Sequence, residues 1–164
     1  ADPKTDFWRV TFDNGIRDNG HFFYQVVSGH FTATVRIAGN YKNQYDQAGL
    51  MIRSDEKNWL KCGIEMVDGH HMVSAVVTRN QSDWSLLPLA KNPESLWIRV
   101  SRNIHTINAY YSLNGHTFQL YRQAYLHTPL DVRVGIMCAS PIGTGFRTLF
   151  EELTIVTQTN PDSP

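Results

Sequence analysis

Neither sign of charge is in excess in this sequence. Lysine and arginine together number 15, as do aspartate and glutamate, so the formal net charge is zero. Without a basic excess the electrostatic surface that nucleic acids require is missing, and we expect no nucleic-acid partner. The arginines are spread among acidic residues, and we interpret each as an individual site or surface residue. They include Arg53, Arg79, Arg99, Arg102, Arg133 and Arg147.

Long apolar runs are also missing. No window approaches 18 consecutive apolar residues, so we expect no membrane-spanning helix and no membrane partner. The first residues, Ala1 to Lys4, lack the apolar core of a signal peptide, which predicts a cytoplasmic protein. A secreted protein that has already lost its signal would look the same.

Cysteine is scarce, and the chain does not need it as a staple. At 164 residues the chain is long enough to bury a core without a disulfide or a metal. Cys62 and Cys138 both fall in the apolar register of strand-like runs, where a thiol behaves as a small hydrophobe. We expect free core thiols, because a disulfide would require the two strands to lie side by side in suitable geometry.

Familiar catalytic and cofactor motifs are absent. There is no Gly-x-Ser-x-Gly elbow, no phosphate-binding Gly-x-x-x-x-Gly-Lys loop and no dinucleotide fingerprint. The pair His70-His71 follows a predicted turn at Asp68-Gly69, where we expect exposed histidines that point apart and chelate poorly. The other five histidines show no ligand spacing. We therefore predict no cofactor and no metal site.

Short strand-like runs dominate what is present, and no stretch shows sustained helical periodicity. Valine, isoleucine, threonine and aromatic residues alternate with polar ones, and glycine, asparagine, aspartate or proline separates the runs. This spacing predicts an all-β fold, a two-sheet antiparallel sandwich of the jelly-roll kind. The clearest runs are residues 31–37, 48–53, 59–67, 72–78, 96–102, 106–113, 118–121, 132–138 and 149–157.

Turn residues support this layout. Asp68-Gly69 and Asn114-Gly115 each separate two strand-like runs and favour the left-handed dihedrals of a tight hairpin. No internal repeat or low-complexity block divides the chain, so we predict a single domain, residues 1–164, with an ordered core of about 6–157. The first few residues and the polar tail, 159–164, are expected to be disordered.

Several motifs along the chain resemble one family. Together they are similar to the "regulation of enolase protein 1" family, a group of unknown function placed with the concanavalin A-like lectins and glucanases. The resemblance implies two curved sheets with a concave face that many relatives in the wider superfamily use to bind sugars, and it implies no established reaction. The motifs are Asp6-Phe7-Trp8-Arg9, residues 18–24, residues 29–36, residues 45–53, residues 58–65 and Ser82-Asp83-Trp84-Ser85.

Side-chain parity identifies a candidate ligand surface on two of the runs. Residues at odd and even positions of a strand face opposite sides of a sheet. In the runs 47–53 and 59–66 the apolar residues occupy one parity, so the polar residues share the other. If the two runs pair as a hairpin, one surface gathers Gln47, Arg53, Trp59, Lys61 and Glu65, with Gly49 and Gly63 leaving room above the backbone.

Three further residues could extend this surface. Arg99 alternates against apolar neighbours in the run 96–102, as Tyr110 does in the run 106–113, and both could add donors and a stacking platform to the same face. Trp84, in a predicted loop, is a candidate residue at the rim or an anchor of that loop to the core. Sugars suit such a surface, because their C–H faces stack on aromatic rings and their hydroxyls need fixed polar partners.

The sequence leaves alternatives to a carbohydrate- or metabolite-binding protein open. An enzyme acting on a glycan would use Glu65 as acid or base, but glycosidases need two carboxyls and no second one is well placed on the face. Lys61 and Arg53 are expected to keep Glu65 ionised, which suits binding better than acid catalysis. A module that binds a protein partner, or an ordinary solvated sheet face, would show the same alternation.

Overall fold

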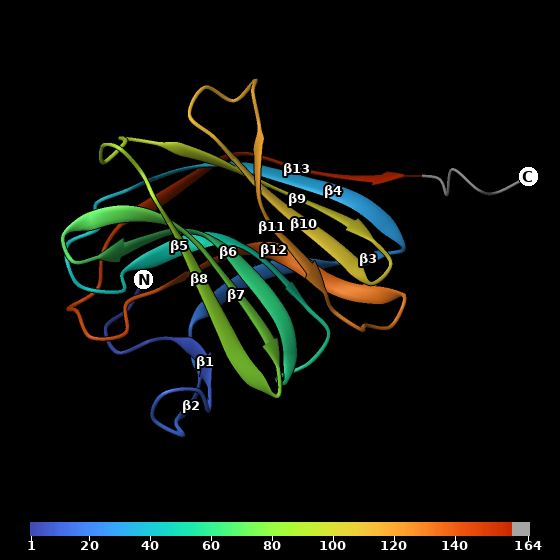
Figure 1. Cartoon of the computed structure of the whole chain (residues 1–164), viewed down its shortest axis with the longest axis horizontal. Coiled ribbons are helices and arrows are strands. Elements are labelled where there is room, and N and C mark those ends of the chain that lie inside the picture. The colour runs from blue at the N-terminus through green and yellow to red at the C-terminus, as the bar shows by residue number, and fades with distance from the viewer. Residues whose placement is uncertain (159–164) are drawn as a thin grey trace, which may run out of the picture.

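Period-two alternation organises the chain into two antiparallel sheets that stack face to face (Figure 1). The computed structural model describes residues 1–158, and the tail predicted to be disordered, 159–164, lies outside them. The five-stranded sheet has the order β11 (Gln119–Tyr125), β10 (Thr106–Ser112), β9 (Leu96–Asn103), β4 (His30–Gly39), β13 (Thr148–Gln158). The six-stranded sheet has the order β3 (His21–Ser28), β12 (Asp131–Ala139), β5 (Gln47–Arg53), β6 (Asn58–Val67), β7 (His70–Arg79), β8 (Gln81–Pro88). The predicted all-β sandwich is confirmed.

The core lies between the sheets and is built by alternate residues of each strand. In β4, Phe31, Ala33, Val35 and Ile37 are buried, while the residues between them are partly exposed on the outer face. Burial of each large apolar side chain contributes roughly 1.5–3 kcal/mol relative to leaving it exposed. The alternation therefore specifies which face of the strand is turned inward.

A third, small layer covers the six-stranded sheet on the side away from the core. It is the hairpin of β1 (Phe7–Arg9) and β2 (Ile16–Asp18), which lies beneath β5 to β8 in Figure 1. β5, β6 and β7 are buried along almost their whole length on both faces, and the β1–β2 layer covers part of the face away from the core. This is unusual for an antiparallel sheet, one face of which commonly meets water.

All nine predicted runs fall in strands, and the sequence missed two full-length ones. β3 and β8 are the edge strands of the six-stranded sheet. Trp84, expected in a loop, lies within β8, where it pairs with Val76 of β7. An edge strand has only one neighbour and more exposed side chains, so its alternation is weaker in the sequence. Pro88 is tolerated at the end of such a strand.

The two predicted hairpin turns differ in the structure. Asp68 and Gly69 both have positive φ, 51° and 80°, and connect β6 to β7 directly, as a type I′ turn requires. Asn114 and Gly115 belong to a longer connection, residues 113–118, in which only Gly115 has positive φ. There the Asn114 side chain accepts hydrogen bonds from the amides of the two residues that follow Gly115.

The beginning of the described chain is ordered, contrary to prediction. Pro3 forms a parallel bridge with Ser140, and the amide of the buried Thr5 donates to the Ser140 carbonyl. Both cysteines are free, as predicted; Cys62 is buried in the core and Cys138 is partly buried against it. Burial raises the pKa of the Cys62 thiol to about 12.

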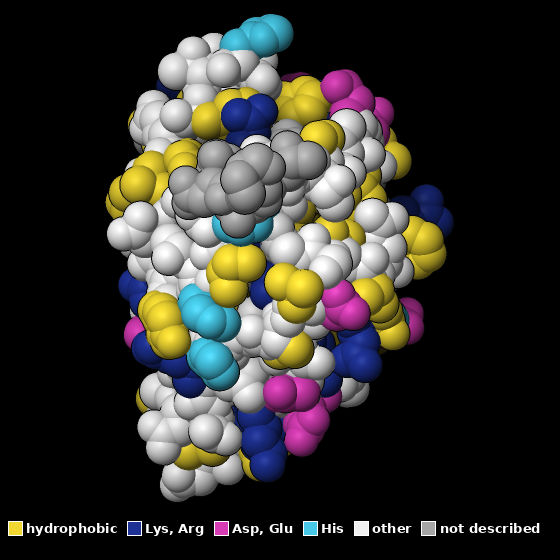
Figure 2. Space-filling model, turned by 90° about the vertical axis from the view of Figure 1, so that its right-hand side faces the viewer, with side chains coloured by type: hydrophobic (Ala, Val, Ile, Leu, Met, Phe, Trp, Pro, Cys, Tyr) yellow, Lys and Arg dark blue, Asp and Glu magenta, His cyan; other side chains and the backbone are white. Residues whose placement is uncertain are grey.

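Residues 1–158 contain no helix long and apolar enough to cross a membrane. On the end of the sandwich that faces the viewer in Figure 2, basic, acidic and apolar side chains are interspersed. That end therefore presents no continuous surface of one charge.

Candidate functional site

The two predicted strands pair as the candidate surface requires. In the β5–β6 hairpin Gln47 lies opposite Glu65, Met51 opposite Lys61, and Arg53 opposite Trp59. All of these side chains leave the six-stranded sheet on the face away from the core. Parity therefore predicted their common direction, although Arg53 and Glu65 stand at opposite ends of the hairpin, about 20 Å apart at the usual rise of a strand.

The β1–β2 layer covers part of this surface. Phe7 of β1 is 2% exposed and packs with Met51, Trp59, Val76 and Met137 in a second apolar cluster outside the main core. The Phe7 ring meets the Trp59 ring edge to face, with the centroids 6.3 Å apart. Trp59 is completely buried, so it does not offer the stacking platform that the sequence predicted.

The cations of the surface hold this covering layer in place. The Lys61 ammonium donates to the Phe7 carbonyl at 2.7 Å and lies 3.4 Å from an Asp6 carboxylate oxygen. At the other end of the hairpin Arg53 binds the Asp18 carboxylate through two hydrogen bonds of 2.7 Å each. Such bidentate pairs are among the stronger polar contacts in proteins. The hydrogen-bond donors of Lys61 and Arg53 are therefore engaged by the β1–β2 layer and the segment before it.

Glu65 occupies the part of the surface that the β1–β2 layer leaves uncovered. The residue is 5% exposed, and the Trp84 indole Nε1 donates to its Oε2 at 3.0 Å. Burial raises the pKa of the Glu65 carboxyl, although the Lys61 ammonium and hydrogen bonds from Ser74 and Trp84 lower it. The prediction that neighbouring cations lower the pKa of Glu65 and keep it ionised is wrong in direction. Desolvation raises the pKa more than Lys61 lowers it, and Arg53 is too far away to contribute.

Trp84 is the half-exposed aromatic residue above this carboxyl. Its side chain is anchored twice, since Nε1 also donates to Ser74 Oγ at 3.2 Å. Tyr45, from the loop before β5, meets the Trp84 ring edge to face with centroids 6.1 Å apart. Trp84 nonetheless remains 38% exposed. We call this group the Trp84 site, and it consists of Tyr45, Gln47, Glu65, Ser74 and Trp84.

The cavity beside the Trp84 site is small. A cavity of about 10 Å³ lies between Gln47, Lys61, Ser74 and Met137, above the backbone at Gly63, and this is room for a single water molecule. Gly49 and Gly63 are directly opposite, and a Cβ on Gly63 would overlap the Ala48 carbonyl oxygen. These glycines thus permit the close approach of β5 and β6, and they do not open a large ligand space.

Arg99 and Tyr110 do not extend this surface. They lie opposite each other on β9 and β10, in the five-stranded sheet, and face outward from the sandwich. The Arg99 guanidinium stacks 3.6 Å from the Phe118 ring centre, and Nε donates to Thr34 Oγ1 at 3.1 Å. The prediction was wrong here because parity assigns a face within a sheet and does not say which sheet a strand joins.

Sequence reasoning missed Asp6, a second carboxylate beside the predicted surface. It lies in the segment before β1, and its Oδ1 is 3.5 Å from Gln47 Nε2 as well as near Lys61. The negative charge of Asp6 also raises the pKa of Glu65. The only signal in the sequence was the motif Asp6-Phe7-Trp8-Arg9, which carried the resemblance and was assigned no site.

The predicted exposed histidine pair is corrected. His70 is exposed, but His71 is buried and meets Tyr41 edge to face with ring centroids 5.2 Å apart. Burial lowers the pKa of His71. Within residues 1–158 no group of three or more histidine, cysteine, aspartate or glutamate side chains is arranged to hold a metal ion.

Replacing Glu65 with glutamine should remove a pH dependence of stability. Because burial raises its pKa in the folded protein, Glu65 retains a proton that the unfolded chain releases. The wild-type free energy of unfolding should therefore fall as pH rises from the ordinary glutamate value of 4.5 through the raised pKa, by up to about 1.4 kcal/mol per pH unit for one proton. Urea unfolding of both proteins across this range measures the difference, and parallel profiles would contradict it.

Comparison with known proteins agrees with the resemblance seen in the sequence. A family model described as "Protein of unknown function (DUF1349)" matches residues 1–158. The protein "Regulation of enolase protein 1" of Saccharomyces cerevisiae is 41% identical over 155 residues, which cover 94% of this chain and 78% of that protein. The predicted family is confirmed.

Solved structures share the fold. The crystal structure of a functionally unknown protein from Saccharomyces cerevisiae superposes with a TM-score of 0.92 at 39% identity, over 98% of this chain and 86% of that one. The carbohydrate binding module CBM66 from Bacillus subtilis superposes with a TM-score of 0.59 at 17% identity, over 90% and 89% of the two chains. At that identity the second likeness concerns the fold alone.

Proposed function

The chain belongs to the DUF1349 family of proteins of unknown function, and we propose that it is a non-catalytic binding protein for a carbohydrate or small polar metabolite. The Trp84 site is where we place the ligand. The observation that carries the proposal concerns the Trp84 indole. It is partly exposed, and its Nε1 donates hydrogen bonds to Glu65 and Ser74, which fix the ring in place. The same fold in a carbohydrate binding module of Bacillus subtilis is consistent with it.

A fixed aromatic face suits a sugar ring. The indole presents apolar area for the C–H face of a sugar, while Tyr45, whose ring meets the indole edge to face, carries a hydroxyl that can bond to those of the sugar. The two hydrogen bonds hold the Trp84 ring before any ligand arrives. Less side-chain entropy is then lost on binding, which is the advantage of a preorganised site.

Binding fits the geometry better than hydrolysis. Glycoside hydrolysis needs two carboxyls with the scissile bond between them, and often space for an attacking water. Here Glu65 lies under Trp84, Asp6 is engaged with Lys61, and the cavity beside them has room for about one water molecule. These features support a ligand that rests on the indole and does not enter the sheet.

Substitution of Trp84 by alanine should weaken ligand binding about 5- to 150-fold, because a stacking contact of roughly 1–3 kcal/mol is lost. A screen of mono- and oligosaccharides by thermal shift, followed by calorimetric titration, identifies the ligand and measures the loss. Trp84→Phe should retain most of the affinity, since the stacking face remains.

Tyr110→Ala is the matched control, because Tyr110 lies on the outer face of the other sheet. It should leave the affinity unchanged. Sugar binding that survives Trp84→Ala and disappears in Tyr110→Ala would refute the location of the site. A wild-type protein that binds no sugar or polar metabolite, yet captures a protein partner without sugar, would refute the proposed function.

A further inference from the structure

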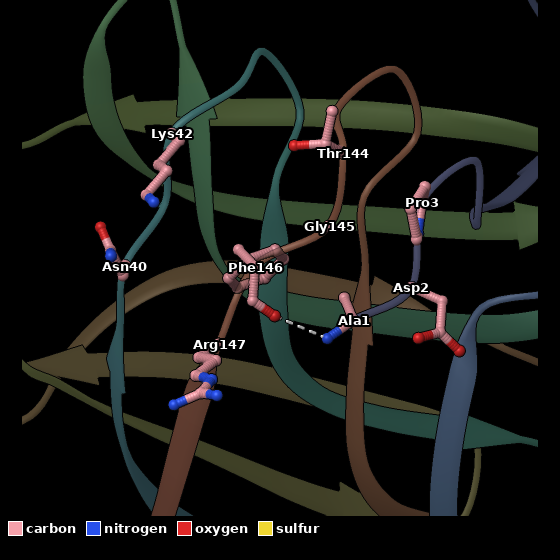
Figure 3. Close-up of a pocket in the computed structure, with 9 residues that line it drawn as sticks. All are labelled: Ala1, Asp2, Pro3, Asn40, Lys42, Thr144, Gly145, Phe146 and Arg147. Atoms are coloured by element: carbon pink, nitrogen blue, oxygen red, sulfur yellow. Dashed lines mark hydrogen bonds between the residues drawn. The ribbon is translucent and has the colours of Figure 1, made fainter.

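A larger cavity lies apart from the Trp84 site, at one end of the sandwich. Its volume is about 520 Å³, within the range of small-molecule sites. The loop before β5, the loop before β13 and residues 1–3 form its walls (Figure 3). The side chains that matter below are Asn40, Lys42, Thr144, Phe146 and Arg147.

The loop that carries Lys42 is held by a buried carboxylate. Asp46 is fully buried, and its Oδ2 accepts hydrogen bonds of 2.9 Å from the amides of Lys42 and Asn43. Its Oδ1 accepts a hydrogen bond of 2.6 Å from the hydroxyl of Ser140, at the start of the opposite loop. Asp46 therefore ties the two loops together and holds the backbone at Lys42.

The opposite wall is anchored in the core. Phe146 is buried and packs on Tyr41, with ring centroids 5.0 Å apart. The Asn40 amide donates to the Arg147 carbonyl at 3.0 Å, which joins the two walls directly. The backbone at Arg147 is thus fixed by Phe146 and by this hydrogen bond, as the backbone at Lys42 is fixed by Asp46, so both walls are positioned by the fold itself.

Positive charge lining this cavity is not neutralised by neighbours. The side chains of Lys42 and Arg147 form no ion pair and no hydrogen bond within residues 1–158. One acidic residue, Asp2, also lines the cavity; its side chain is 80% exposed to water, and His21 Nε2 accepts a hydrogen bond from its backbone amide. Two cations thus stand against one carboxylate. Figure 3 shows Asp2 on the far side of Ala1 from Lys42 and Asn40, whose polar ends face each other. The cavity therefore carries a local positive charge in a chain of zero net charge.

We propose that this cavity binds a small molecule through a phosphate-type oxyanion. Both kinds of cation bind such an oxyanion, a guanidinium through paired donors and an ammonium as a point charge. In Figure 3 the Lys42 ammonium and the Arg147 guanidinium line separate parts of the cavity, so either can receive the oxyanion while both contribute to the positive charge. The side-chain amide of Asn40 and the Thr144 hydroxyl supply uncharged donors at the rim. The site does not depend on the Trp84 site, which lies on the face of the six-stranded sheet.

Titration of the 164-residue chain with inorganic phosphate and with glucose 6-phosphate tests the proposal, at constant ionic strength with chloride as the reference anion. Calorimetry or chemical shifts of the 40–46 and 140–147 amides report binding. We expect the double substitution Lys42→Gln with Arg147→Gln to weaken the binding of both probes at least tenfold. Because both side chains are exposed and unpaired within the described chain, the melting temperature without ligand should stay unchanged.

Lys57→Gln with Arg79→Gln is the charge-matched control, because both side chains are exposed outside the cavity, Lys57 between β5 and β6 and Arg79 at the end of β7. This variant and Trp84→Ala should bind the probes as the wild type does. Equal weakening in the control would show a general charge effect and overturn the proposal. Failure of both probes to bind the wild type would also overturn it, whatever the outcome of the sugar screen at Trp84.

Discussion

Replacing Arg102 with methionine should lower the free energy of unfolding by about 4 kcal/mol or more. Arg102 is 2% exposed, and its guanidinium donates five hydrogen bonds of 2.6–3.0 Å. Removal of a buried charged donor leaves its acceptors unsatisfied, at a cost of roughly 1–3 kcal/mol for each group before relaxation. The acceptors are the carbonyls of Gly29, Ile104, Pro129 and Leu130 and the hydroxyl of Thr128.

These acceptors belong to three connections, between β3 and β4, β9 and β10, and β11 and β12, so one side chain joins both sheets at this end of the sandwich. The sequence interpretation of Arg102 as a site or surface residue is wrong. Arg102→Lys should recover only part of the stability, since an ammonium has three donors without the planar fork. Urea unfolding measures both variants, with the exposed Arg79→Met as control. A midpoint equal to that of the control would contradict the assignment.

Replacing Phe7 with alanine should lower the free energy of unfolding by about 3–5 kcal/mol, the usual cost of truncating a buried phenylalanine. The ring fills the cluster with Met51, Trp59, Val76 and Met137, and its loss leaves a cavity under the β1–β2 layer. The effect should also be local. Hydrogen exchange should accelerate in β1 and β2 more than in β4 or β9, because the layer loses its apolar contact with the six-stranded sheet.

Phe12 provides a control on the same segment, since its side chain is fully exposed at the tip of the β1–β2 hairpin. Phe12→Ala should change the free energy of unfolding by less than about 0.5 kcal/mol. If the two substitutions had equal effects, Phe7 would not be the contact that holds the layer. Uniform acceleration of exchange over the whole chain in Phe7→Ala would show that the layer does not open separately.

Much of the fold was predictable because its signals are local. Alternation within β4 or β9 follows from a few consecutive residues, and so does the turn at Asp68-Gly69. The two strands missed, β3 and β8, lie at sheet edges, where one neighbour and partial exposure relax the pattern. Trp84 was recognised as a candidate but assigned to a loop for the same reason.

The candidate site was predictable only in part. Parity correctly directed Gln47, Lys61 and Glu65 to one face, because side-chain direction is a property of the strand itself. It could not reveal that Phe7 covers Trp59 or that Asp6 reaches Lys61, since these contacts join segments far apart in the chain. The charge balance at Glu65 was wrong for the same reason, because its burial depends on contacts with other segments, among them Trp84 of β8.

The sequence by itself determined nine of the strands, the inward face of strands such as β4, and the family of this protein, because each of these follows from neighbouring residues or from short motifs. Tertiary structure alone decided which faces remain open. It closed the surface over Trp59 and Lys61, placed Arg99 and Tyr110 on the other sheet, and brought Lys42 and Arg147 to one cavity. The physical reason is that the exposure and the charge environment of a side chain depend on which distant segments pack against it. The periodicity within a strand does not contain that information.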